Sequence, residues 1–518
     1  MATAAPAGAA LLTTARPRVH APSGNAQVTR GASLISAQDT PGLARDPTDP
    51  ADLVLVDRVD RPDYSAAVQY STDGGRTWLP SALQAPPESD YPAALALVPH
   101  KLYAPSAVFD DKGTLYVSFV TLSGSGNQPD GVWIERSNDA GQSFLPPSAV
   151  AGPHSFQVEV AVDGRSGRLF ATWLQAQSFL CVLCFPTTGM PIVFSHSDDG
   201  GKTWTAPVRV SDPRRARVGS PAVAVDARGN PSVLYYDYEG DEADWGNLPG
   251  TYHGHFSLVL ARSSDGGDTF GRGRVLDSAI VPPYRFLIYL APEPAFAIGA
   301  DGEMVVAWPD ARSGSTRVLL RHSSDGGTSW AGPVVVNGET AHGSVQDLPA
   351  AAVAPDGRVD VLYYDASGST VNTYLSSSGD GGRSFPTVIK VSTEPSNLQV
   401  GPQTSPYAPH ADFGSRLALV STDGAALAAW TDTRNGSSGT GKQDVYFAEI
   451  RVIPPAGSGG LVVLLAVGGG VVAVIGALVL VARRRHSRRP GRRRGPPRSD
   501  SFDMPPPPPP LVPSPGQV

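Results

Sequence analysis

An eight-residue pattern that recurs six times limits what this chain can fold into more than any other feature of its sequence. The pattern is S-x-D-x-G-x-[ST]-[WF], as in STDGGRTW at residues 71–78, and we call each copy a box. The aspartates of successive boxes lie 55 to 66 residues apart. Self-similarity at such a period indicates an array of similar supersecondary units. The six box aspartates are Asp73, Asp139, Asp199, Asp265, Asp325 and Asp380.

The residue types of the box are those of a tight turn between two strands. An aspartate can accept hydrogen bonds from backbone N–H groups of the turn, and a glycine can adopt positive φ without a Cβ clash. The Ser or Thr hydroxyl can close the other side of the turn, and the final aromatic ring can pack on the next strand. None of these tasks needs a substrate, so we expect the six aspartates to be structural.

Each box follows three short apolar segments, which makes four strands per unit. In the second unit the segments are PSAVFD (105–110), TLYVSFV (114–120) and VWIE (132–135), and the fourth strand follows the box. Four antiparallel strands in a unit of this length are typical of a β-propeller blade. The fold class is therefore predicted to be all-β, with four-stranded antiparallel blades.

The strand pattern gives seven units, although there are six boxes. Residues 411–436 supply two further strands and residues 444–450 a third, without a box or a fourth strand. The segment NAQVTRG (25–31) resembles the fourth strands of the other units. We therefore expect the two ends of the region 25–452 to share one blade and close the ring, which removes exposed sheet edges.

The C-terminal part of the chain has the pattern of a single membrane span. Residues 460–482 contain no charge, and eight arginines follow within residues 483–494. A helix of 23 residues crosses a hydrocarbon layer about 30 Å thick. By the positive-inside rule the tail, 483–518, is cytoplasmic and the propeller extracellular, joined to the span by the linker 453–459. The proline-rich end of the tail offers a docking segment for a cytoplasmic partner.

The N-terminal residues 1–24 are expected to be a leader or a disordered segment. They lack a basic stretch and have only a short apolar patch interrupted by proline, which makes a poor signal peptide. We expect the true start of the exported protein to lie upstream of Met1.

Charge excludes one class of partner for the outer part of the chain. The tail after Ala482 holds nine arginines and two aspartates, so the rest has 32 basic and 46 acidic residues, a net charge of about −14. A surface this acidic does not favour nucleic acid or an anionic membrane. Carbohydrate or a cell-surface protein is the expected partner.

The boxes resemble the Asp-box, or BNR repeat, of the sialidase-like β-propellers, and the resemblance covers residues 25–452. Sialidases of this fold have six blades, so six blades stand as the alternative to the seven units counted here. Their catalytic set is a Tyr nucleophile assisted by Glu, an acid/base Asp and three arginines, the first in an [FY]-R-I-P motif near the N-terminus. That motif is absent; the nearest string, YRFL at 284–287, lies mid-chain. The resemblance thus implies recognition of glycans or proteins at the cell surface, with exo-α-sialidase activity as the alternative.

A site is expected on the face opposite the boxes, where long loops connect the strands. These loops are 235–256, 278–293 and 393–414, and they gather carboxylates, aromatic rings and an arginine, which suit sugar binding. A solvated rim without a ligand is the competing interpretation. The catalytic candidates are Tyr284, Arg285, Glu293, Asp237, Arg312 and Arg434, and the ligand-binding candidates are Trp245, His253, His255, Tyr407 and His410.

Two D-x-R pairs end second strands of their units, Asp310 with Arg312 and Asp432 with Arg434. Each arginine could bind an anionic ligand, but a salt bridge between blades fits the repeated spacing better.

The sequence contains only weak indications of a metal site or of reactive cysteines. No cofactor is expected, although Ca²⁺ could be held near Asp237, Glu239 and Asp241, which lack a recognised calcium-loop spacing. In an exported protein, Cys181 and Cys184 are expected to form a local disulfide, because a zinc site would need two more ligands.

Overall fold

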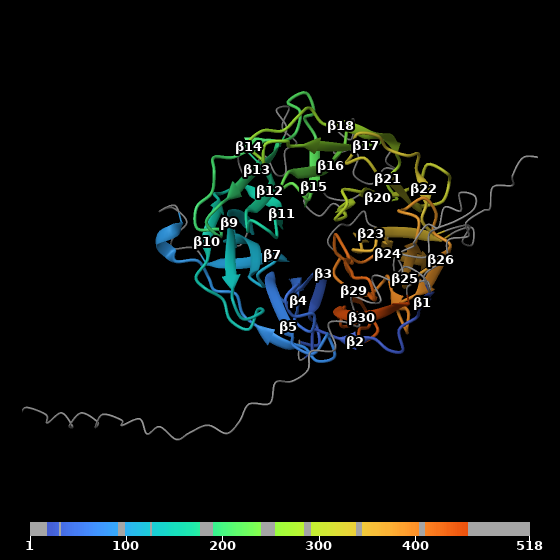
Figure 1. The fold of residues 1–518 in the computed structure, drawn as a ribbon. Coiled ribbons are helices and arrows are strands. Elements are labelled where there is room, and N and C mark those ends of the chain that lie inside the picture. Colours follow the sequence, from blue (N-terminus) through green and yellow to red (C-terminus); the bar gives the residue numbers. More distant parts are fainter. Residues whose placement is uncertain are drawn as a thin grey trace, which may run out of the picture. The chain divides into compact units, whose positions relative to one another are not determined.

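The computed structural model describes residues 18–30, 33–91, 99–124, 127–176, 190–239, 254–283, 292–337, 344–403 and 410–453. These residues form seven antiparallel sheets arranged as blades around a central axis (Figure 1). The first strand of each blade lies nearest the axis and contacts the first strand of the next blade, all the way round from β3 through β28 and back to β3. The expected all-β propeller is confirmed.

Blades I to III contain the following strands. Blade I consists of β3 (Ala37–Arg45), β4 (Leu53–Arg61), β5 (Ser65–Ser71) and β6 (Leu79–Ser81), and blade II of β7 (His100–Phe109), β8 (Leu115–Ser123), β9 (Gln128–Ser137) and β10 (Ser148–Ala151). Blade III consists of β11 (Ser155–Val162), β12 (Leu169–Gln175), β13 (Ile192–Ser197) and β14 (Val208–Arg209). A single turn of 3-10 helix within the described residues, η1 (Glu88–Asp90), lies between blades I and II.

Blades IV to VI follow the same order. Blade IV consists of β15 (Val218–Val225), β16 (Pro231–Asp237), β17 (Phe256–Arg262) and β18 (Arg274–Ile280), and blade V of β19 (Ala295–Ile298), β20 (Met304–Asp310), β21 (Arg317–Ser323) and β22 (Val334–Val335). Blade VI consists of β23 (Val345–Val353), β24 (Val359–Ser367), β25 (Thr370–Ser378) and β26 (Thr387–Lys390), with β27 (Ser396–Asn397) also paired to β25.

Blade VII joins the two ends of the propeller region. It contains β28 (Ala418–Ser421), β29 (Ala425–Asp432) and β30 (Asp444–Ile453) from the C-terminal end, and β1 (Arg18–His20) and β2 (Ala26–Gln27) from the N-terminal end. Both N-terminal strands pair antiparallel with β30. The expected closure is confirmed, and its strand pairing begins before residue 25. The six-blade alternative is wrong, because there are seven sheets; the seventh, blade VII, forms although it contains no box.

Each box lies at the turn between the third and fourth strands of its blade. In the first box, Asp73 Oδ1 accepts hydrogen bonds from the backbone N–H groups of Arg76 and Thr77, both at 2.9 Å, and Oδ2 accepts the Thr77 hydroxyl at 2.6 Å. The Ser71 hydroxyl donates to Asp73 Oδ1 at 2.8 Å and accepts the Gly75 N–H at 2.9 Å. The aspartate thus replaces missing backbone partners in the turn.

The second glycine of the first box also packs the blade against its neighbour. Gly75 has a φ of +84°, and a Cβ at this position would lie 2.3 Å from the ring of Phe447 in blade VII. Glycine is therefore required both by the positive φ and by the close approach. The Trp78 Nε1–H donates to the Gly75 carbonyl at 3.0 Å, which holds the ring over the turn.

Replacement of a box aspartate should weaken the fold in a pH-dependent way. Hydrogen bonds, first that from the Thr203 hydroxyl, lower the pKa of Asp199 to about 2. The stabilisation by the ionised carboxylate is therefore fully present above the ordinary pKa and is lost as the pH falls towards 2. We expect Asp199→Asn to lower the melting temperature at pH 7 and to have a smaller effect at pH 2.5, measured by scanning calorimetry. The exposed turn variant Asp301→Asn is the control; equal effects of the two variants at pH 7 would contradict this role.

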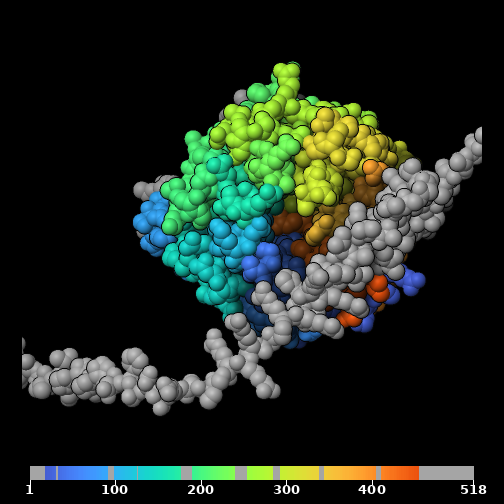
Figure 2. Space-filling model, viewed as in Figure 1, coloured from blue at the N-terminus to red at the C-terminus, as the bar shows by residue number. Residues whose placement is uncertain are grey.

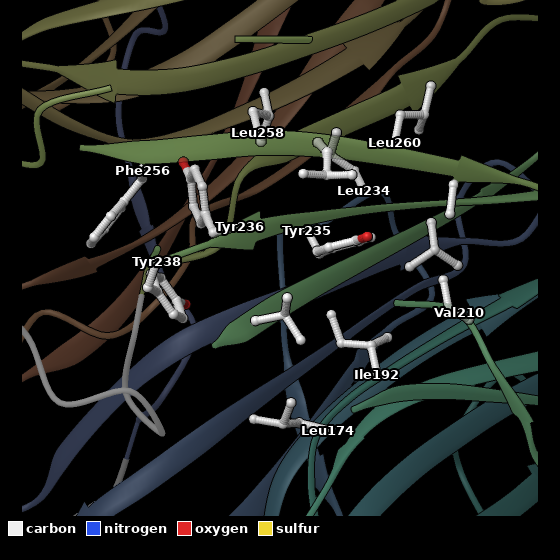
Figure 3. Close-up of a cluster of buried hydrophobic side chains, with 14 of the residues drawn as sticks. Leu174, Ile192, Val210, Leu234, Tyr235, Tyr236, Tyr238, Phe256, Leu258 and Leu260 are labelled. Atoms are coloured by element: carbon white, nitrogen blue, oxygen red, sulfur yellow. The ribbon is translucent and has the colours of Figure 1, made fainter. Parts of the chain in front are cut away.

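Hydrophobic packing between blades supplies the core. The largest cluster lies mainly between blades III and IV, where Leu174 and Ile192 face residues of β16 and β17 (Figure 3). Among these, the rings of Tyr238 and Phe256 are 4.8 Å apart and nearly perpendicular. The ring of blades is hollowed at its centre on the face seen in the space-filling view (Figure 2).

The predicted membrane span, residues 460–482, and its flanking linker and tail lie outside the described residues. Within the described part of the chain, no helix combines the length and the apolar character that crossing a membrane requires.

Candidate functional site

The innermost strands share a distortion at the end opposite the boxes. In five blades the first strand carries a bulge at which a non-glycine residue has a positive φ of 48° to 54°. Such conformations cost of order 1–3 kcal/mol each, and bulges re-aim the side chains beside them. These residues are Thr40, Ala104, Gln157, Ser220 and Leu348.

Arg416 links five of the seven blades across the axis. It precedes β28 in blade VII, and its Nη1 donates to Glu159 Oε1 of blade III at 2.6 Å and to Glu293 Oε1 of blade V at 3.1 Å. Its Nη2 donates to the Pro105 carbonyl of blade II at 2.8 Å, and its Nε to the Pro41 carbonyl of blade I at 3.3 Å. Since the blades surround the axis, a side chain with these contacts occupies the centre of the ring. We call Arg416, Glu159 and Glu293 the central triad.

Burial and charge give the triad unusual protonation behaviour. Desolvation raises the pKa of Glu159 to about 7; Arg416 partly offsets the rise, and the nearby charge of Glu293 adds to it. Burial acts to lower the pKa of Arg416, but Glu293 and Glu159 outweigh it and raise the pKa. At neutral pH, Glu159 is therefore divided between its acid and carboxylate forms beside a permanent cation.

The two carboxylates of the triad are close and reachable from solvent. Because both oxygens lie within 3.1 Å of one nitrogen, they are less than about 6 Å apart. The side chains of Arg416, Glu159 and Glu293 are 16%, 19% and 21% exposed. The Ser106 hydroxyl donates to Glu159 Oε2 at 3.3 Å. The three side chains of the triad are therefore largely buried but partly accessible to solvent.

A second charged cluster lies next to the triad. It is centred on Arg58 of blade I and is more deeply buried than the triad. The Arg58 Nε lies 2.9 Å from both Asp39 Oδ1 and Asp60 Oδ1, and its Nη2 lies 3.3 Å from Asp412 Oδ2. Tyr103 donates its hydroxyl to Asp60 Oδ1 at 2.9 Å. Desolvation raises the pKa of Asp39 and of Asp60, although Arg58 opposes the rise.

Two hydroxyl side chains connect the clusters. The Thr40 hydroxyl donates to Asp39 Oδ1 at 2.8 Å and accepts the Ser415 N–H at 3.1 Å, and the Ser415 hydroxyl donates to Glu293 Oε1 at 3.2 Å. Arg58 also acts to lower the pKa of Arg416, because the two guanidinium groups repel each other. The two clusters form one continuous polar network.

Of the residues predicted from the sequence, Glu293 lies in the triad. Asp237 instead pairs with Arg215, which precedes blade IV, and Glu239 accepts the hydroxyl of Ser257. Arg312 bridges Asp310 of its own blade and Asp277 of blade IV, the latter at 2.6 Å. This contact is an ion pair between blades.

Arg434 is likewise used between blades. It pairs with Asp432 at 2.7 Å, donates to the Thr393 hydroxyl at 3.1 Å and to Asn25 Oδ1 at 3.1 Å, and lies 4.1 Å from the centroid of the Tyr446 ring. These contacts tie the N-terminal segment and blade VI to blade VII. Neither D-x-R arginine presents a guanidinium group to the triad.

The ligand-binding candidates are only partly described. His255 is exposed next to the start of β17, and His410 is half-buried with its Nδ1 2.7 Å from the Ala411 carbonyl oxygen. No group of three or more His, Cys, Asp or Glu side chains suited to a metal ion occurs among the described residues. The predictions for Tyr284, Arg285, Trp245, His253, Tyr407, Asp241, Cys181 and Cys184 lie outside those residues.

Sequence reasoning missed Glu159, Arg416 and Arg58. One signal was available for Glu159, since VEVAVD (158–163) places a carboxylate where the equivalent segments of blades II, IV and VI have Ser106, Ala222 and Ala350. A charged residue in an innermost strand stands out once the segments are aligned. Arg416 had no comparable signal, because its partners lie 123 or more residues away in the chain.

Comparison with known proteins agrees with the box pattern. Residues 189–435 match the family described as BNR repeat-like domain. A stretch of 152 residues, 26% of this chain, is 28% identical to a sialidase of Bacteroides fragilis (strain YCH46), and it spans 27% of that protein's length.

Two solved structures are similar in outline. A protein of unknown function from Dyadobacter fermentans DSM 18053 has 14% identity and a TM-score of 0.46, covering 84% of this chain and 99% of its own. A Hadza microbial sialidase has 15% identity and a TM-score of 0.42, covering 78% of this chain and 74% of its own. The match over residues 189–435 and the six boxes confirm the resemblance of this β-propeller to BNR-repeat, sialidase-like proteins.

Proposed function

We propose that the protein recognises carbohydrate at the central triad. The observation that carries this proposal is the convergence of Glu159, Arg416 and Glu293 from three blades, with each side chain partly exposed. Carboxylates and a guanidinium group present several hydrogen-bond acceptors and donors in a small space. Sugar hydroxyls require this kind of partner, and the likeness to a sialidase supports the same class of ligand.

We also propose that recognition takes place at the outer cell surface. The support is the uncharged segment 460–482 and the arginine-rich segment 483–494 that follows it. The short linker 453–459 would then hold the propeller near the membrane.

A glycan array probed with the full chain tests the recognition proposal. We expect reproducible binding to at least one class of sugar, and at least a tenfold weaker signal for Arg416→Lys, because lysine keeps the charge but loses the contacts to several blades. Arg76→Lys, in the exposed turn of the first box, should bind like the wild type. Absence of binding to any glycan, or equal binding by Arg416→Lys, would refute the proposal.

A second candidate function is hydrolysis of a glycosidic bond at the same site. The observation that favours it is the Glu159 and Glu293 pair, whose oxygens are less than about 6 Å apart. Glu159, with its pKa of about 7, is suited to protonate a leaving group. Glu293, which is paired with Arg416, is suited to attack the anomeric carbon as the protonated leaving group departs, and to form a covalent glycosyl intermediate, which water then hydrolyses.

A further inference from the structure

We propose that the central site selects neutral and amino sugars and rejects acidic ones. This inference rests on the proposed recognition of carbohydrate at the triad and names the charge class of its ligand. It differs from the expectation set by the likeness to sialidases, whose ligand carries a carboxylate.

The first argument is that the arginines of the site are already paired. Arg416 contacts Glu159 at 2.6 Å and Glu293 at 3.1 Å. Arg58 contacts Asp39, Asp60 and Asp412 within 3.3 Å. A ligand carboxylate binds well only to a guanidinium group with free N–H donors in a fork. At the two arginines that the structure describes in this network, an acidic sugar would have to displace a carboxylate of the protein to obtain one.

The second argument is the balance of charge in the network. Within the described residues it contains two arginines and five carboxyl groups, so acidic groups outnumber the cations by more than two to one. A second anion placed here would meet like charges in a region of low dielectric constant, where Coulomb energies exceed those in water several-fold. An ammonium group at the same place would be attracted.

The third argument is the supply of hydrogen-bond acceptors. The Oε2 of Glu159 accepts the Ser106 hydroxyl at the long distance of 3.3 Å. Each ionised carboxylate has about four acceptor positions, which neutral sugar hydroxyls or an ammonium group can fill as donors. A carboxylate or sulfate group on the ligand supplies only acceptors, so it cannot donate to the acceptor positions of the protein carboxylates.

Matched sugars on one array test the inference with the full chain. The probes are neutral oligosaccharides, their amino-sugar counterparts and their uronic, sialylated or sulfated counterparts. We expect the neutral or amino form to bind at least tenfold more strongly than its acidic counterpart. Added NaCl should weaken binding of the amino form and narrow the gap to the acidic form, because salt screens charge interactions.

The variant Glu293→Gln provides an independent readout. It removes one negative charge beside Arg416 and changes the side chain little in size, so the preference against acidic sugars should fall at least fivefold. Asp198→Asn, on the exposed box turn of blade III, should leave the preference unchanged. Stronger binding of acidic than of neutral sugars by the wild type would overturn the inference but leave carbohydrate recognition standing. No binding to any sugar would overturn both.

Discussion

Replacement of Arg416 by alanine should lower the free energy of unfolding by about 3–5 kcal/mol at pH 7.5, since it leaves two largely buried carboxylates without their cation. Arg416 also donates to carbonyl groups of two further blades, at 2.8 Å to Pro105 and at 3.3 Å to Pro41. These acceptors would lose their partner as well. Urea unfolding of the full chain, followed by tryptophan fluorescence, measures the loss.

The loss should depend on pH in a defined direction. Without Arg416, Glu159 and Glu293 are most unfavourable when both are ionised, so protonation at pH 5 should relieve part of the loss. The exposed variant Arg76→Ala should change stability by no more than about 0.5 kcal/mol. An Arg416→Ala protein as stable as the Arg76→Ala control at pH 7.5 would show that the triad does not hold the blades together.

Replacement of Glu159 by glutamine should have the largest effect on any hydrolysis. If Glu159 is the general acid, we expect kcat to fall roughly 10²- to 10⁴-fold for fluorogenic glycosides that the wild type cleaves. Sugar binding should persist, because glutamine keeps the size and the hydrogen-bonding oxygen of the side chain. Unchanged kcat in Glu159→Gln would contradict the assigned role.

The role of Glu159 can also be tested without an activity assay, by measuring how the stability of the same variant depends on pH. Burial raises the pKa of Glu159 from its ordinary value of 4.5 to about 7. The folded state therefore binds a proton more tightly than the unfolded state, and wild-type stability should fall as the pH rises from about 4.5 to 7. Glu159→Gln should show a smaller decrease, because it lacks the contribution of this group, and urea unfolding at several pH values would detect the difference.

Glu135 in β9 supplies a matched control for both readouts. It is 1% exposed, burial raises its pKa to about 8, and its Oε1 accepts the backbone N–H of Gln84 at 2.7 Å. It lies in the third strand of blade II, and among the residues that the structure describes no hydrogen bond or ion pair joins it to the triad. Glu135→Gln should change the pH dependence of stability at higher pH but leave sugar binding and kcat unaltered.

The repeated local features of the fold could be predicted from the sequence. Each box encodes its own turn, since Asp73 and Ser71 bond to groups within four residues in the chain. The count of seven blades followed from the strand pairs and not from the boxes, because the last blade takes its outer strands from the N-terminus. Local patterns thus predict the blades. The N-terminal strands, which belong to no box-containing unit, predict how the ring closes.

The candidate site could be predicted only in part, because its contacts are not local. The D-x-R spacing predicted that Arg312 forms a salt bridge between blades, but it could not identify the partner Asp277, which belongs to a different part of the sequence. Glu293 was identified from a loop rich in polar and aromatic residues. Arg416 and Glu159 could not be identified in this way, because they contact each other only once blades III, V and VII meet at the axis. A closed ring brings together residues that no spacing rule connects.

The most direct test of the central triad as the ligand site is hydrogen exchange of the full chain, measured by mass spectrometry with and without a saturating oligosaccharide from the array. We predict slower exchange in peptides that cover 100–109, 155–162 and 410–418, which surround the triad, and no change in the box turn at 197–204. Slower exchange at the box turns with no change in those three segments would contradict the account.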